Sequence, residues 1–143
     1  MNPITLDQAQ TLISATLAKA GSEGMNSLCV VVLDGGGHML ACARQDGVPF
    51  GRVEIAHAKA FGAISIGMNS RTLEAMALER PHFIGGASRA VGGAVVPVAG
   101  GLIIVDGDGN RIGSVGVSGD TSDNDEIAAR AGLEAAGLAA ADR

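Results

Sequence analysis

The chain has 143 residues, a formal net charge of -5, and 47% hydrophobic residues that include three Phe but no Trp or Tyr. A negative chain without a run of Lys and Arg lacks the basic surface of nucleic-acid binding proteins, so we exclude nucleic acid as a partner. No stretch approaches the roughly 18 apolar residues of a membrane span, and the N-terminal segment lacks the features of a signal peptide. We therefore expect a cytoplasmic protein with no membrane partner.

This composition allows a hydrophobic core that buries little apolar area per residue. The sequence contains 22 Gly residues, and most of its apolar residues are Ala, Val, Ile and Leu. Apolar burial stabilises a fold by about 25 cal/mol per Å², and small side chains bury little area each, which favours burying further surface between subunits. We expect one domain over residues 1–143 that forms a homo-oligomer.

The first third of the chain predicts a helix followed by a hairpin. Thr5-Leu6-Asp7-Gln8 matches a capping box, and the apolar residues after it fall on one helical face until Gly21 ends the helix. Residues 28–33 and 39–44 are then expected to form two antiparallel strands, with both faces of the first strand covered.

The two cysteines fall on these two strands. If Gly35 and Gly36 form a two-residue turn, Cys29 lies directly opposite Cys42. In a reducing cytosol we expect two small, buried apolar residues rather than a disulfide or redox pair. Two cysteines without C-x-x-C spacing do not predict a zinc site, and we expect no bound metal.

The middle of the chain predicts two helices and an irregular segment. Residues 53–68 have helical periodicity, and a second, shorter helix is expected over residues 72–78. Pro81 ends that helix. Residues 82–100 are glycine-rich, with only a short strand expected around residues 95–98.

The last third predicts a second hairpin and a final helix. Residues 102–105 and 112–117 have the pattern of two strands joined by a tight turn over residues 106–110. Ser122 is the expected N-cap of a helix over residues 123–137, whose acidic first turn suits the helix dipole. The order helix, hairpin, helix, loop, hairpin, helix favours an α+β fold in which helices pack outside an antiparallel β-sheet.

Five short sequence motifs resemble those of one protein family. They are DGGGHML at residues 34–40, ARQDG at 43–47, AHAKA at 56–60, IGSVGVSG at 112–119 and DNDE at 123–126. Together they resemble the GlcG/HbpS-like heme-binding-protein family, which is PduO C-terminal-domain-like, over nearly the whole chain. The resemblance implies a profilin-like architecture, heme as the ligand and an association with catabolism.

Two local motifs have ordinary structural explanations. Asp106-x-Asp108-x-Asn110 begins like a calcium loop, but Arg111 and Val117 stand where that loop needs Gly and Glu, so we expect a hairpin turn. The glycines within residues 113–119 precede a helix start as in a phosphate loop. The acidic residues within 120–126 would repel an anion there.

His57 and Glu54 are the candidate catalytic pair. They share a helix face, and a carboxylate one turn before an imidazole can orient and tune it. The alternative is a surface pair of no functional consequence. His38 is a candidate ligand-binding residue, with a structural or solvent-facing role as its alternative. Lys59 is a further ligand-binding candidate, because the resemblance places it at the lysine of the family's Lys-Ala motif. The alternative is that its aliphatic stem simply covers the helix.

Arg44 and Arg52 are the candidate carboxylate-binding residues. Arg52 lies at the start of a predicted helix, where the dipole disfavours a cation by roughly 0.3–1 kcal/mol unless an anion is near. Arg44 ends a predicted strand only eight residues earlier. Both guanidiniums could bind one carboxylate by bidentate contacts. A salt bridge to Asp46 or Glu54 is the alternative.

Three classes of function remain. The first is a small-ligand binding protein for an anionic or planar molecule, heme being the cofactor that the resemblance implies, which needs an apolar slot, an axial donor and cations for the propionates. The second is a cofactor-independent isomerase, tautomerase or lyase for a small hydroxy or keto acid, with His57 or Glu54 moving the proton. The third is a structural or assembly subunit.

Overall fold

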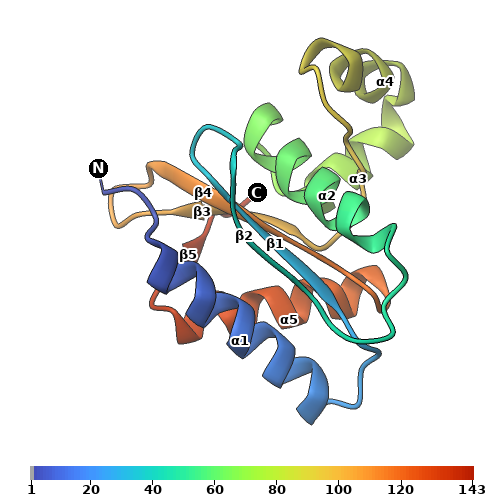
Figure 1. Ribbon diagram of the computed structural model, residues 1–143. Helices are drawn as coiled ribbons and strands as arrows, with labels where there is room; N and C mark the ends of the chain where they lie inside the picture. Colours follow the sequence, from blue (N-terminus) through green and yellow to red (C-terminus); the bar gives the residue numbers. More distant parts are fainter. Residues whose placement is uncertain (1) are drawn as a thin grey trace.

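The computed structural model describes residues 2–143 and contains one antiparallel five-stranded sheet in the order β2-β1-β4-β3-β5 (Figure 1). The strands are β1 (Cys29–Asp34), β2 (Met39–Arg44), β3 (Gly101–Val105), β4 (Arg111–Ser118) and β5 (Ala139–Ala140). The helices are α1 (Leu6–Ser22), α2 (Arg52–Ile66), α3 (Ser70–Glu79), α4 (Pro81–Ala90) and α5 (Ser122–Ala135). The predicted α+β fold with outer helices is confirmed.

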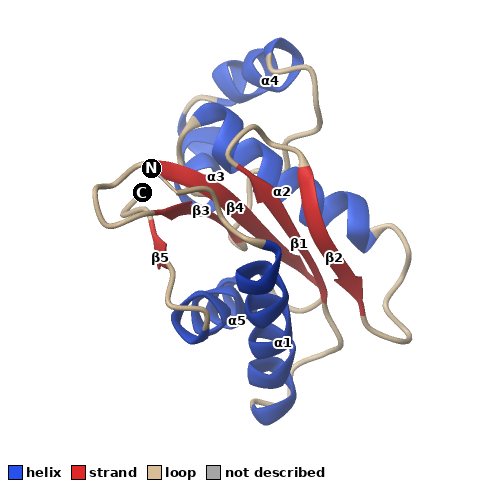
Figure 2. Ribbon diagram, turned by 60° about the vertical axis from the view of Figure 1, so that its left-hand side comes forward, coloured by secondary structure: helices blue, strands red, loops and turns tan. Residues whose placement is uncertain are grey.

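Helices cover both faces of the sheet. Figure 2 shows α1 and α5 on one face and α2 with α3 on the other. Val30 and Val32 of β1 belong to the core beneath α1 and α5, whereas Val31 and Leu33 belong to the core beneath α2. All four side chains are fully buried, so both faces of β1 are covered, as expected from its unbroken apolar run.

Local signals explain where the elements begin and turn. At α1 the amide of Gln8 donates to Thr5 Oγ1 at 3.1 Å and the amide of Thr5 donates to Gln8 Oε1 at 3.0 Å, which confirms the capping box. Between β3 and β4, Asp106 Oδ1 accepts the amides of Asp108 and Asn110. The segment is a hairpin turn, as predicted, because its carboxylate is used to close the loop.

The close contact of α2 with β4 depends on glycine. A methyl group at Gly116 would overlap the carbonyl oxygen of Ala56 in α2. The absence of a side chain lets the backbone of α2 lie directly on the centre of the sheet. This contact fixes the position of the first turns of α2 relative to β1 and β4.

The predicted alignment of the cysteines is wrong. The loop between β1 and β2 contains a third glycine, Gly37, with φ +82°, and the pairing shifts by one residue near the turn. Cys29 consequently pairs with Arg44, and Cys42 pairs with Val31. Both cysteines are free and lie on the same side of the sheet. Cys29 is buried, as expected, but Cys42 is exposed because it lies on the edge strand β2, so its predicted burial is wrong.

The segment after α3 differs most from the prediction. Pro81 ends α3 but is also the first residue of α4, a position where the fixed φ of proline favours a helix. Residues 95–98 form no strand. In Figure 1, α4 stands away from the sheet at the edge of the molecule.

The last helix and strand add two smaller corrections. The N-cap of α5 is Thr121, one residue before the predicted Ser122, and its Oγ1 accepts the amide of Asn124 at 3.2 Å. The chain then adds β5, which was not predicted because it has only two residues. Within residues 2–143, each helix is too short or too polar to span a lipid bilayer.

Candidate functional site

The first turns of α2 are flanked by two clefts. One, the His57 cleft, has a volume of about 330 Å³ and is lined by Met39, Val53, Glu54, His57 and Ala94. The other, the Arg52 cleft, has a volume of about 370 Å³ and is lined by Asn26, Ser27, Asp46, Gly47, Val48, Pro49, Arg52 and Gly119. The start of α2 therefore carries both candidate binding sites.

The His57 cleft brings together the predicted catalytic pair. His57 is half-buried and stacks on Phe61 one turn later, with ring centroids 5.9 Å apart and an angle of 15° between the rings. Glu54, which is exposed, lies one turn earlier in the same cleft. The stacking limits rotation of the imidazole, so its orientation is held by α2 itself.

Met39 also lines the His57 cleft and was not predicted as a site residue. It pairs with Leu33, whose side chain packs beneath α2, so Met39 also lies on the side of β2 that faces α2. The pairing places Cys42 and Arg44 on this same side. The signal in the sequence is weak, because the shift in pairing near the turn breaks the simple alternation along the strand.

Cys29 lies on the neighbouring strand β1, opposite Arg44 and on the same side of the sheet. Its burial, with the neighbouring Cys42, raises the pKa of the Cys29 thiol to about 12. The thiol is therefore protonated at neutral pH and unreactive.

Arg52 enters the other cleft, and Arg44 does not line it. Arg52 Nη1 donates to Ser118 Oγ at 3.2 Å, whereas Arg44 Nη1 donates to the carbonyl of Val48, a wall residue of the Arg52 cleft, at 3.4 Å. Within residues 2–143, neither guanidinium forms a salt bridge with Asp46 or with any other carboxylate. Arg52 is thus a binding candidate, and Arg44 braces the cleft wall.

Lys59 lies in the interior, away from both clefts. Its Nζ is 2.9 Å from Asp125 Oδ2 and donates to the carbonyl of Val117 at 2.9 Å. Burial raises the pKa of Asp125, opposed by the nearby ammonium of Lys59 and by the amide of Asp120. Lys59 therefore joins α2 to α5. In the sequence, Asp125 is visible only as a negative charge in the first turn of a predicted helix.

His38 lies in the β1–β2 loop, exposed and outside the residues that line the two clefts. Its amide donates to Asp34 Oδ1 at 2.9 Å, as does that of Gly36. Asp34 organises the loop through these bonds. Within residues 2–143, no group of three His, Cys, Asp or Glu side chains could hold a metal ion.

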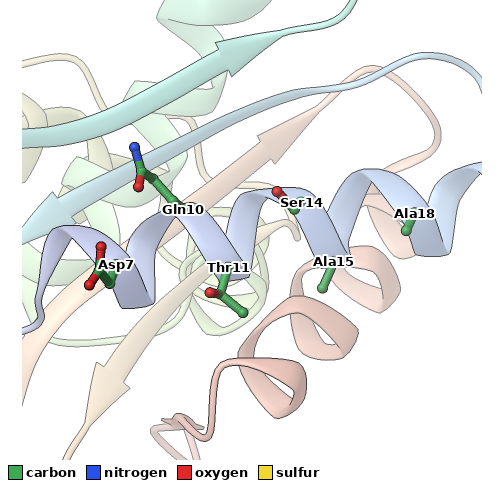
Figure 3. A pocket seen from close by; sticks show the side chains of 6 residues that line it. All are labelled: Asp7, Gln10, Thr11, Ser14, Ala15 and Ala18. Carbon is green, nitrogen blue, oxygen red and sulfur yellow. The ribbon is translucent and has the colours of Figure 1, made fainter.

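Two further hollows are lined by residues outside α2. The larger of the two, about 680 Å³, lies between the N-terminal segment and the β3–β4 turn, and Asp106 is among the residues that line it. The other follows the outer surface of α1, where Figure 3 shows small and polar side chains spaced along the helix. These six are Asp7, Gln10, Thr11, Ser14, Ala15 and Ala18.

Comparison with known proteins identifies the family. A family model described as haem degrading protein HbpS-like matches residues 4–134. The chain belongs to this HbpS-like family. The resemblance noted in the sequence is thereby confirmed. No curated protein sequence matches the chain.

Solved structures share the fold of this HbpS-like chain. The crystal structure of HbpS has 29% sequence identity and a TM-score of 0.80, covering 94% of this chain and 90% of its own. Klebsiella pneumoniae protein ORFY has 26% identity and a TM-score of 0.85, covering 96% and 92%. A PduOC:heme complex has 22% identity and a TM-score of 0.85, covering 96% and 98%, and at that identity the similarity bears on the fold alone.

Proposed function

We propose that the chain binds heme, or a similar planar anionic ligand, in the His57 cleft. One observation carries the proposal: a histidine imidazole and a methionine thioether line the same cleft beside the apolar Val53 and Ala94. Imidazole and thioether are the donors that commonly hold heme iron, and an apolar wall suits the macrocycle. Membership in the family described as haem degrading protein HbpS-like supports the same ligand.

The residues present fit this ligand in three respects. His57 supplies an imidazole that Phe61 holds in place, and Met39 supplies a second soft donor. Val53 and Ala94 supply apolar contacts for the macrocycle. Bound iron would supply redox chemistry, while these residues would hold and orient the ligand.

The size of the cleft supports the predicted homo-oligomer. A volume of about 330 Å³ is near the lower end of the range for ligand pockets, roughly 300–1,000 Å³. A macrocycle held there would keep one edge outside the cleft, and a neighbouring subunit would cover it. The cytoplasmic location and the association with catabolism stay predictions.

Titration of the protein with hemin tests the proposal. The expected result is saturable binding with a shifted Soret band, weakened at least tenfold in His57→Ala and changed in band position in Met39→Leu. His82→Ala, which removes an exposed imidazole on α4, is the matched control and should bind like the wild type. Equal binding and identical spectra in His57→Ala and the control would contradict the assignment.

Proton-transfer catalysis is the second candidate function, favoured by the presence of Glu54 and His57 in one cleft. The substrate would be a small hydroxy or keto acid. The test is turnover of such acids by the protein without added cofactor. The enzyme hypothesis expects turnover to be lost in His57→Ala and Glu54→Gln while the fold persists, and an inactive wild type would exclude it for the acids tested.

A further inference from the structure

Arg52 has an unusual environment for a cation. It is the first residue of α2, where the helix dipole opposes a positive charge. A guanidinium has five N–H donors, and within residues 2–143 the side chain makes one hydrogen bond, to Ser118 Oγ. The remaining donors have no acceptor among residues 2–143 and reach solvent, so they are available to a ligand.

An unpaired acid lines the same cleft. Asp46, in the loop between β2 and α2, is exposed to the Arg52 cleft and forms no ion pair or side-chain hydrogen bond within the described part of the chain. Its carboxylate therefore lies more than 4.0 Å from the guanidinium of Arg52. A cation and an anion thus share one hollow without neutralising each other.

The walls around these two charges are held in place. The amide of Asn26 donates to Asp120 Oδ1 at 2.8 Å, and the carbonyl of Val48 accepts from Arg44 Nη1 at 3.4 Å. Gly119 has φ +152°, and a methyl group there would overlap the carbonyl of Ser27. These contacts join the loops that line the cleft to the rest of the fold.

We propose that the Arg52 cleft binds a small zwitterion, a free α-amino acid, with its carboxylate on Arg52 and its ammonium group on Asp46. A guanidinium fork matches a carboxylate in bidentate geometry, and the aspartate offers acceptors to an ammonium. A ligand with only negative charge meets repulsion from Asp46, and one with only positive charge meets repulsion from Arg52. The cleft, at about 370 Å³, has room for a small side chain beside the polar Asn26 and Ser27.

This site is separate from the His57 cleft and does not depend on heme binding. The two clefts share no lining residue. Loss of amino-acid binding and loss of hemin binding can therefore be measured independently on the same variants.

Calorimetric titration with glycine and with its two halves, acetate and methylammonium, tests the proposal. Glycine is expected to bind at least tenfold more tightly than either half, and serine to bind comparably. Arg52→Gln and Asp46→Asn should each weaken glycine binding at least tenfold. Arg52→Lys keeps the positive charge but loses the bidentate guanidinium, so it should also weaken glycine binding. This second variant keeps the test valid if Arg52→Gln fails to fold.

The matched controls are Arg89→Gln and Asp108→Asn. Each removes the charge of an exposed residue that does not line the Arg52 cleft. Both should bind glycine like the wild type. Acetate binding as tightly as glycine would overturn the zwitterion assignment in favour of a simple anion site. The absence of saturable glycine binding in the wild type, or unchanged binding in Asp46→Asn, would overturn it as well.

Discussion

Lys59 of α2 and Asp125 of α5 form a buried ion pair, 2.9 Å from Nζ to Oδ2, that joins helices on opposite faces of the sheet. The ammonium also donates to the carbonyl of Val117 at the end of β4. A buried pair of this kind is weak evidence of net stabilisation, but removing one partner leaves the other charge buried without compensation.

Replacing Lys59 with Met should destabilise the protein by about 3–5 kcal/mol, because Asp125 would then be buried and unpaired. The double variant K59M/D125N removes both charges and keeps an acceptor for the amide of Asp120, so it should recover much of the loss. Urea unfolding of the wild type and the two variants measures this. A Lys59→Met variant as stable as the wild type would show that the ion pair does not stabilise the contact between α2 and α5.

The Asp120 carboxylate predicts a loss of stability in acid. It accepts hydrogen bonds from the amides of Asn26 and Thr121 and from the side chain of Asn124, and these hold its pKa below the ordinary value of 3.8. A lowered pKa in the folded state means that the stabilisation is complete above pH 3.8 and is lost as the pH falls through the folded pKa.

Asp120→Asn should therefore be less stable than the wild type at pH 7, and the difference should shrink as the pH falls below 3.8. The measurement is the free energy of unfolding of both proteins from pH 7 to pH 3. Asp108→Asn is the control for the loss of a surface carboxylate. A difference that stays constant with pH would rule out the hydrogen-bonded carboxylate as its source.

The two cysteines should differ in reactivity. With native protein at pH 8, iodoacetamide should modify Cys42 and leave Cys29 intact, since Cys29 is buried and its pKa is raised to about 12. Unfolding in denaturant should make both react, as peptide mass spectrometry would show. Equal labelling of the two in the native state would mean that this edge of the sheet opens readily.

The contact of α2 with β4 predicts intolerance of a methyl group at Gly116. Gly116→Ala would overlap the carbonyl of Ala56 and force α2 away from the sheet, at a cost of roughly 1–3 kcal/mol or more. Gly107→Ala, in the β3–β4 turn, meets no atom within 4 Å and is the matched control. Thermal unfolding should distinguish the two, and equal midpoints would contradict the packing described here.

Local sequence signals predicted the parts of the fold that depend on neighbouring residues. The capping box at Thr5 and the turn at Asp106 are closed by hydrogen bonds between residues three or four positions apart, so their chemistry is visible in the sequence. The start of α4 was missed because Pro81 serves both to end one helix and to begin the next.

The candidate site was predictable only in part, for a related reason. Glu54 and His57 are one helical turn apart, and a helix necessarily places them together. Met39 reaches the same cleft only through a shifted strand pairing, which depends on the conformation of Gly37. The contact between Lys59 and Asp125 joins residues 66 positions apart, and no local pattern encodes it.

The central proposal is that the imidazole of His57 binds the heme iron. Rescue of the His57→Ala variant by free imidazole tests it most directly. We predict that His57→Ala with hemin lacks the Soret band position of the wild-type complex, and that added imidazole restores it by occupying the vacated space. A His57→Ala complex whose spectrum already matches the wild type, without added imidazole, would contradict the account.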